Sequence, residues 1–150
     1  MNTTLGGESN YLVQGMREES MQAKQPKPSP AKNHNQLLGR RGEDLALAYL
    51  LERGYILLGR NVRTAYGELD LVMRQVDALV FVEVKARRNT AFGYPEDGVN
   101  RQKHAHLTTS ALAYLQAHPE IDSSWRIDIV AVEIGAAEPT ITHFENVFSE

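Results

Sequence analysis

The chain has 150 residues, of which 42% are hydrophobic and 23% charged, a composition typical of one globular domain. Its net charge of −3 excludes a protein that coats nucleic acid through bulk positive charge. The absence of cysteine excludes disulfides, thiolate metal sites and thiol nucleophiles. The longest apolar run, Leu45 to Leu51, is too short to cross a bilayer, and no secretory signal precedes it. We therefore expect a soluble cytoplasmic protein with no membrane partner.

Residues 1–35 differ from the rest of the chain because they are poor in aliphatic side chains and end in a proline-rich run, Pro26 to Pro30. Such a segment cannot bury enough apolar surface to offset its ordering entropy, so we expect a flexible, disordered tail. One α/β domain should then occupy residues 36–150. Within it, residues 36–103 carry 11 Lys and Arg against 9 Asp and Glu, whereas residues 104–150 carry 1 against 7. The basic groups therefore gather in the first part of the domain.

The first expected element of this domain is an amphipathic helix from Gln36 to Arg53, where apolar residues recur at spacings of three, four and seven. Gly54 should end it, and Asn100 should cap a second helix that ends before Pro119. The order αβββαββ predicts an α/β core with helices flanking a mixed sheet. The expected strands are Tyr55–Arg60, Tyr66–Arg74, Leu79–Arg87, Trp125–Glu133 and Thr140–Phe148, with a tight connection over 75–78 and a loop over 88–99.

The hairpin between the second and third strands contains the most informative pattern. If the turn is centred between Val76 and Asp77, opposed residues share one face as the pairs Val72 with Phe81, Asp70 with Glu83, and Glu68 with Lys85. The other face is aliphatic and belongs in the core, which makes a slip of one residue costly. A different turn length would shift these pairs. The aliphatic face consists of Leu69, Leu71, Val80, Val82 and Val84.

Opposed carboxylates at Asp70 and Glu83 are destabilising unless something neutralises them. One interpretation is an exposed face on which Glu68 and Lys85 form a weak cross-strand salt bridge. That interpretation explains Asp70 and Glu83 poorly, because such a sheet tends to be covered on both faces. A hard divalent cation, Mg²⁺ or Mn²⁺ in its place, explains the pair better, since Mg²⁺ prefers carboxylate oxygens. Lys85 could then orient or help deprotonate a water on the metal and stabilise negative charge.

The two helices offer further polar residues. Glu43 shares the inward stripe of the first helix, so it needs a partner: either this metal site, or Arg40 in a salt bridge, or an exposed edge position. Lys103 lies on the inner stripe of the second helix, where it either reaches the same site or extends its stem to solvent.

Three segments resemble the signatures of the YraN-type bacterial family: Gly42-Glu43 opening a helix, residues 67–72 (GELDLV) and residues 81–87 (FVEVKAR). That family is similar to the restriction-endonuclease-like PD-(D/E)xK nucleases, particularly the Holliday junction resolvase branch. The resemblance covers essentially all of residues 36–150 and implies a restriction-endonuclease-like core. It also implies that Asp70, Glu83 and Lys85 stand at the D…ExK positions and Glu43 at the helix-borne acidic position. The sequence has Glu68-Leu69-Asp70 where the superfamily pattern has Pro-Asp, which leaves open whether Glu68 also reaches the metal.

The resulting hypothesis is a Mg²⁺-dependent nuclease that hydrolyses phosphodiester bonds, with branched or single-stranded DNA as its substrate. Its phosphate contacts are expected from Arg87, Arg88 and Arg101, which flank the loop after the third strand; the alternative is that these are ordinary solvated side chains. The rival hypotheses are a catalytically silent nucleic-acid- or protein-binding module and a structural adaptor. The oligomeric state stays open, a homodimer included.

Three other polar residues carry weaker signals. His104 and His106 point in different directions on a helix and are expected to be ordinary surface histidines. Asp128 faces the same side of its strand as Val130 and Val132, and it is interpreted as either a supporting acid behind the metal ligands or a strand-edge residue.

Overall fold

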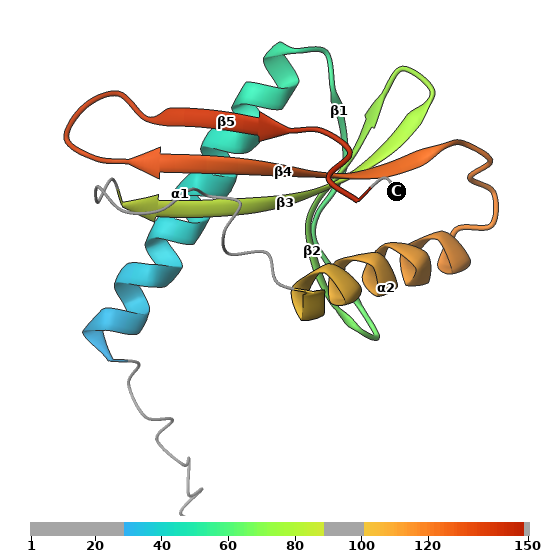
Figure 1. Cartoon of the computed structure of the whole chain (residues 1–150), viewed down its shortest axis with the longest axis horizontal. Helices are drawn as coiled ribbons and strands as arrows, with labels where there is room; N and C mark the ends of the chain where they lie inside the picture. Colours follow the sequence, from blue (N-terminus) through green and yellow to red (C-terminus); the bar gives the residue numbers. More distant parts are fainter. Residues whose placement is uncertain (1–28, 89–100, 149–150) are drawn as a thin grey trace, which may run out of the picture.

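The computed structural model describes residues 29–88 and 101–148. They form a five-stranded mixed sheet with one helix on each face, α1 (Pro30–Glu52) and α2 (Arg101–Ala117) (Figure 1). The sheet order is β1-β2-β3-β4-β5, and only β3 and β4 run parallel. The expected α/β class and the order αβββαββ are confirmed, in an arrangement consistent with a restriction-endonuclease-like core. The strands are β1 (Ile56–Thr64), β2 (Gly67–Gln75), β3 (Ala78–Arg88), β4 (Trp125–Ile134) and β5 (Thr140–Phe144).

Helix α1 begins earlier than the expected Gln36. Ser29 caps it, because its side chain accepts a hydrogen bond from the N–H of Lys32 at 3.4 Å, and Pro30 occupies the first helical turn, where a missing N–H costs nothing. The Ser-Pro pair is therefore a helix start rather than part of an extended stretch. The expected disorder of residues 1–28 and the capping role of Asn100 lie outside the described residues.

The resemblance suggested that the Gly42-Glu43 pair opens a helix, but the pair lies inside α1. Gly42 is needed where α1 crosses β3: a Cβ atom added to Gly42 would lie 2.3 Å from the Cβ of Ala86. Two small residues thus let the helix backbone approach the strand closely. The close approach at Gly42 also brings the neighbouring residue, Glu43, near the sheet.

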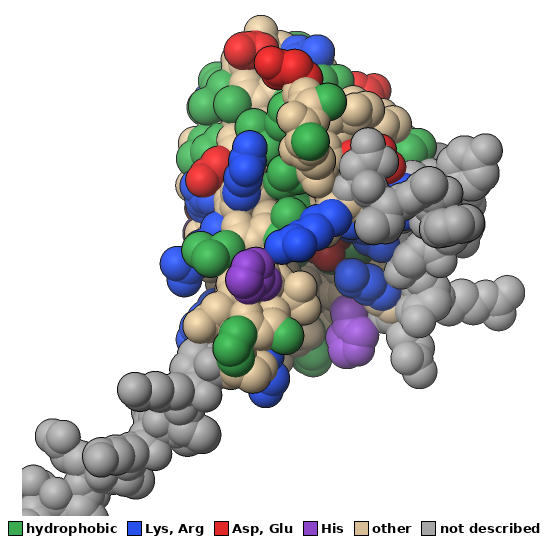
Figure 2. Space-filling model, turned by 90° about the vertical axis from the view of Figure 1, so that its left-hand side faces the viewer, with side chains coloured by type: hydrophobic (Ala, Val, Ile, Leu, Met, Phe, Trp, Pro, Cys, Tyr) green, Lys and Arg blue, Asp and Glu red, His purple; other side chains and the backbone are tan. Residues whose placement is uncertain are grey.

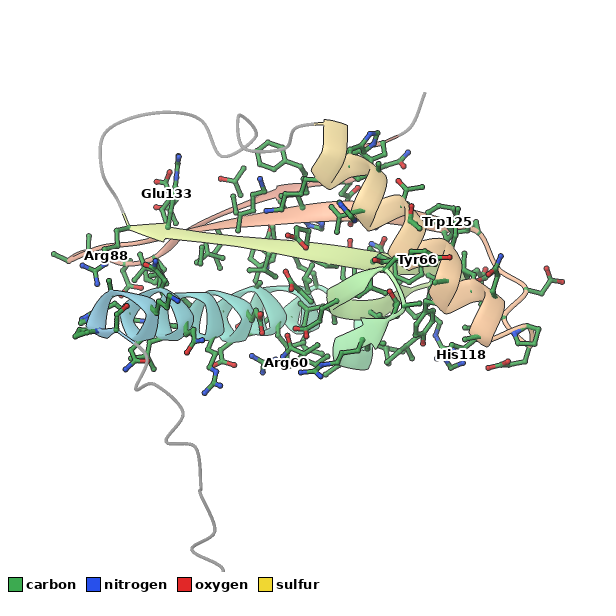
Figure 3. The ribbon with its side chains drawn as sticks, turned by 90° about the horizontal axis from the view of Figure 1, so that it is seen from below. Arg60, Tyr66, Arg88, His118, Trp125 and Glu133 are labelled. Carbon is green, nitrogen blue, oxygen red and sulfur yellow. The ribbon has the colours of Figure 1, made fainter. Side chains whose placement is uncertain are left out.

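Each helix covers its own hydrophobic cluster (Figure 3). Ala46 and Leu50 of α1 pack on Leu71, Met73, Val80, Val82, Val130 and Val132. Leu107 and Ala111 of α2 pack on Leu69, Val72, Leu79, Phe81 and Ile127. The expected aliphatic face is therefore correct except at Leu69, which lies on the α2 side.

Leu69 changes sides because β2 leaves β3 before it reaches this residue. At Leu69 only the pairing with β1 continues, opposite Val62, and the β1–β2 turn lies beside the second half of α2 (Figure 1). Strand β1 is longer than expected, since it continues to Thr64, and β5 is shorter, since it ends at Phe144. No helix within 29–88 or 101–148 combines the length and apolar character that a membrane span requires.

Candidate functional site

Strands β2 and β3 form a fork whose two branches carry the predicted carboxylates. The predicted register is confirmed near the turn, where the ladder runs from Gln75 opposite Ala78 to Leu71 opposite Val82. Beyond it, Glu83 has no partner on β2 and keeps its pairing with Ile129 of β4, which runs along almost the whole of β3. The Oδ2 atom of Asp70 accepts a hydrogen bond from the N–H of Val84 at 2.9 Å, so a side chain replaces the missing strand partner. We call Asp70 and Glu83 at this point the carboxylate fork.

The two carboxyl groups of the fork lie close enough to share a hydrogen bond. The pKa of Asp70 is raised to about 7: burial raises it most, the nearby Glu83 charge raises it as well, and the hydrogen bond from Val84 opposes the shift. Burial also raises the pKa of Glu83, while the ammonium groups of Lys103 and Lys85 lower it. The side chain of Glu83 is only 13% exposed. The fork is thus a largely buried pair of carboxyl groups, each of which ionises less readily than it would in water.

Glu43 approaches the fork from α1, and its charge contributes to the raised pKa of Asp70. Its side chain is 17% exposed, and its Oε2 atom lies 3.4 Å from Arg60 of β1. Arg60 also binds Asp44 at 2.6 Å. Glu43 is therefore paired with Arg60, whereas the salt bridge to Arg40 considered from the sequence is absent from the described structure.

Lys85 and Lys103 place positive charge on the other side of Glu83. The Nζ atom of Lys103, from α2, lies 3.7 Å from Glu83 Oε1. Burial lowers the pKa of Lys85, and the charge of Lys103 lowers it further, while Glu83 acts in the opposite direction. Two strands and two helices therefore bring Glu43, Asp70, Glu83, Lys85 and Lys103 together.

The register predicted from the sequence places Glu68 opposite Lys85, but the two residues do not pair in the structure. Because the β2–β3 ladder ends before this position, Glu68 lies opposite Arg63 of β1, with 3.8 Å between Arg63 Nε and Glu68 Oε2. Asn61, at a φ of 49°, lies between the side chains of Glu43 and Glu68. With its amide oriented to donate, its nitrogen is 3.2 Å from Glu68 Oε1 and 3.3 Å from Glu43 Oε2.

The oxygen donors of the fork fit a hard divalent cation in chemistry and charge. Within 29–88 and 101–148, no group of three or more His, Asp or Glu side chains is arranged to hold a metal. Mg²⁺ is nevertheless commonly bound through only one or two carboxylates, with water and substrate phosphate completing its shell. Asp70 and Glu83 satisfy that smaller requirement, and both have a raised pKa, so a cation bound to them would favour their ionised forms.

The model of the uncharacterised protein family UPF0102 matches residues 42–132, which include Glu43, Asp70, Glu83, Lys85 and Lys103. The chain belongs to the UPF0102 family. It is 43% identical over 114 residues to a UPF0102 protein of Syntrophomonas wolfei, an alignment that covers 76% of this chain and 99% of the relative. It is 44% identical over 113 residues to one of Anaeromyxobacter dehalogenans, covering 75% and 84%. The YraN-type resemblance is thereby confirmed.

The arginines expected to contact phosphate differ from one another in this UPF0102 chain. Arg87 binds Glu133 at 2.9 Å on the face away from α1. Arg88 is exposed and lies beside the N-terminal half of α1, as Figure 3 shows. The side chain of Arg101 lies outside the described residues.

Asp128 is fully buried and belongs to a separate network on the α1 side of the sheet. It accepts hydrogen bonds from Arg126 Nε, His143 Nε2 and the N–H of Asn146, each at 2.9 Å. Burial alone would raise its pKa, but these donors lower it below the usual value. Arg126 also donates to Tyr55 at 3.0 Å. Neither interpretation made from the sequence is therefore correct: Asp128 supports the join of β4 and β5.

Sequence reasoning missed Arg60 and Asn61, which hold Glu43 and Glu68 in place. Their signal was weak, because an Arg-Asn pair in a β-strand has no periodicity that points to a site. Of the two histidines on α2, His106 is exposed as expected, whereas His104 is half-buried with Nε2 lacking a hydrogen-bond partner among the described residues.

Proposed function

We propose that this UPF0102 protein is a divalent-metal-dependent nuclease that hydrolyses phosphodiester bonds in branched or single-stranded DNA. The observation that carries the proposal is the carboxylate fork with Lys85 beside it. A fold that needed no cation would gain nothing from bringing Asp70 and Glu83 within hydrogen-bonding reach of each other in a half-buried site.

Asp70 and Glu83 would hold Mg²⁺ or Mn²⁺, with Glu43 as a further carboxylate near Asp70. When bound, such an ion supplies a Lewis acid for the phosphoryl group and a water activated for attack. Asp70 is oriented for this role by the N–H of Val84, which donates to its Oδ2 atom. Glu83 is oriented by its position in the β3–β4 ladder and by Lys103 at 3.7 Å.

Lys85 would act on the reacting groups rather than on the fold. Its ammonium is half-buried, and its pKa is lowered by burial and by Lys103, which makes a proton on Nζ easier to release than in an exposed lysine. It can orient the attacking water or donate a hydrogen bond to the phosphate oxygens as negative charge develops.

The substrate class follows from the charge of the chain and the recess of the site. Because the net charge is −3, affinity for plain duplex should be weak and steeply dependent on salt. Glu83 is largely buried, so a phosphate must bend toward it. A flexible branch or single strand does this at a lower deformation cost than straight duplex.

The test is cleavage of end-labelled flap, single-stranded and duplex DNA at low salt, with Mg²⁺ or Mn²⁺ and with EDTA. We expect metal-dependent nicking of the flap and the single strand by the wild type, and its loss in Glu83→Ala and Lys85→Ala. Asp122→Asn is the matched control, because Asp122 is an exposed carboxylate in the connection between α2 and β4. This variant should cleave like the wild type.

Metal binding separates the outcomes. Calorimetric titration of Mn²⁺ should give binding in the wild type and in Lys85→Ala but none in Asp70→Asn. A wild-type protein that binds the metal and cleaves none of the three substrates would overturn the nuclease and favour the silent binding module. Unfolding of Lys85→Ala, seen by circular dichroism, would contradict the catalytic role of that lysine.

A further inference from the structure

A shallow hollow of about 350 Å³ lies at the end of β3 farthest from the β2–β3 turn, between the first half of α1 and the last residues of β3 and β4. Its basic lining consists of His34, Arg41 and Arg88, and its apolar lining includes Leu37, Leu38 and Ile134. We call it the basic hollow. Sequence reasoning noticed Arg88 but had no reason to place it with α1.

Helix α1 supplies one wall of the basic hollow through residues spaced at three, four and seven, which therefore share one helix face: His34, Leu37, Leu38 and Arg41. This half of the helix, from Pro30 to Arg41, contains Lys32, Arg40 and Arg41 and no Asp or Glu. The dipole of α1 adds positive potential at the same end.

Strand β3 supplies the opposite wall through Arg88, which lies next to Ile134 of β4. Figure 2 faces this end of the molecule and shows Lys and Arg side chains and a histidine across its middle. Arg41 and Arg88 have no hydrogen-bond or ion-pair partner among residues 29–88 and 101–148, whereas Arg60, Arg87 and Arg126 are all paired with carboxylates. The two guanidinium groups are thus available to an anion.

We propose that the basic hollow binds one nucleotide of a single-stranded DNA arm, with its phosphate on Arg41 and Arg88 and its sugar and base against Leu37. This inference rests on the proposed function and names where the strand leaves the carboxylate fork. Leu37 is 64% exposed between the basic side chains, and its aliphatic surface can bury the sugar and the face of an unpaired base, which stays covered inside a duplex.

The basic hollow and the carboxylate fork lie along the same strand but on opposite faces of the sheet. Glu83 and Arg88 are five residues apart on β3, which corresponds to about 17 Å at ~3.3 Å per residue, and their side chains alternate so that Glu83 faces α2 and Arg88 faces α1. Because the β2–β3 ladder ends at Val82, no described strand pairs with β3 on that side beyond this residue. A flexible DNA strand can pass from the fork to the hollow around this edge of β3.

Fluorescence anisotropy with a labelled oligothymidylate tests the basic hollow, in EDTA so that binding is measured without cleavage. Arg41→Ala and Arg88→Ala should each weaken binding roughly twofold to fivefold and reduce the slope of log K against log salt by about 0.7. Arg74→Ala is the matched control, since Arg74 is exposed on β2 and lines a different surface hollow. Leu37→Ala should weaken binding of the oligothymidylate and leave binding of a duplex unchanged.

Equal effects of Arg74→Ala and of the two hollow variants, with circular dichroism showing all of them folded, would overturn the inference. Equal losses of duplex and single-strand binding in Leu37→Ala would overturn the assignment of an unpaired nucleotide. The proposed function fails separately. If Arg41→Ala and Arg88→Ala bind the oligothymidylate more weakly but the wild type cleaves nothing with Mn²⁺, the hollow is supported and the nuclease is refuted. If the wild type cleaves DNA but both arginine variants bind the oligothymidylate as the wild type does, the nuclease is supported and the hollow is refuted.

Discussion

Replacing Asp70 by Asn should stabilise the metal-free protein at neutral and higher pH. The Asn oxygen can still accept the hydrogen bond from Val84, and its amide can donate to Glu83, so the contacts survive while the repulsion is removed. Burial, together with the charges of Glu83 and Glu43, raises the pKa of Asp70 from 3.8 to about 7, and a shift of one unit corresponds to about 1.4 kcal/mol. The full shift is therefore worth about 4 kcal/mol at most. Because Glu83 shares the proton, we expect about 2 kcal/mol.

The sign of this effect follows from proton binding. Native Asp70 holds its proton more tightly than the unfolded chain does, so the wild type loses stability as the pH rises from about 4 to about 7, and the loss is complete above that interval. The variant lacks this titration. Its stability should equal that of the wild type near pH 4 and exceed it at pH 8. Other carboxylates, such as Asp128, titrate alike in both proteins and cancel in the comparison.

Urea unfolding followed by far-UV circular dichroism measures the difference at both pH values in EDTA, with Asp122→Asn as the control for loss of one exposed carboxylate. Added Mg²⁺ should then raise the melting temperature of the wild type and leave that of Asp70→Asn unchanged, because only a native site that binds the ion is stabilised by it. A variant that is no more stable than the wild type at pH 8, or equally more stable at both pH values, would refute the strained fork. Equal responses to Mg²⁺ would refute the metal site.

Three further substitutions, the first with a matched control, test the fold, each by urea unfolding. Gly42→Ala should lower the free energy of unfolding by about 2 kcal/mol, because the new Cβ would lie 2.3 Å from that of Ala86. Its control, Gly39→Ala, has nothing within 4 Å of the new Cβ and should raise the free energy of unfolding by up to about 1 kcal/mol through helix propensity. Equal effects would contradict the close crossing of α1 and β3. Val76→Asn should gain about 1 kcal/mol with an unchanged m-value, since Val76 is 83% exposed and has a φ of 53° that a β-branched residue adopts at a cost; a loss would show that the turn is not strained. Asp128→Asn should cost about 3 kcal/mol, because it removes the one buried charge around which its hydrogen-bond donors are arranged, and a neutral result would show that the network contributes only local order.

The sequence predicted most elements because their signals are local. Alternation in β2 and β3 specifies which side chains face α1, and a one-residue slip would bury the polar set, so the register from Leu71 opposite Val82 to the turn was predictable. The start of α1 was misjudged because a Ser-Pro pair serves equally as a helix cap and as part of an extended run. Both conformations are locally allowed, and the helical one is stabilised because the second half of α1 packs against the sheet.

What the sequence by itself determined is the set of elements, the aliphatic stripes and the presence of acidic and basic residues of the right types on adjacent strands. Where the β2–β3 ladder ends, and therefore how Asp70 meets Glu83, was decided by tertiary structure, because β2 must follow β1 toward α2 while β3 stays with β4. The pairing of Glu43 with Arg60 and the approach of Arg41 to Arg88 were decided in the same way. These contacts join residues distant in the chain, and their geometry depends on how closely α1 packs on the sheet, which no local pattern specifies.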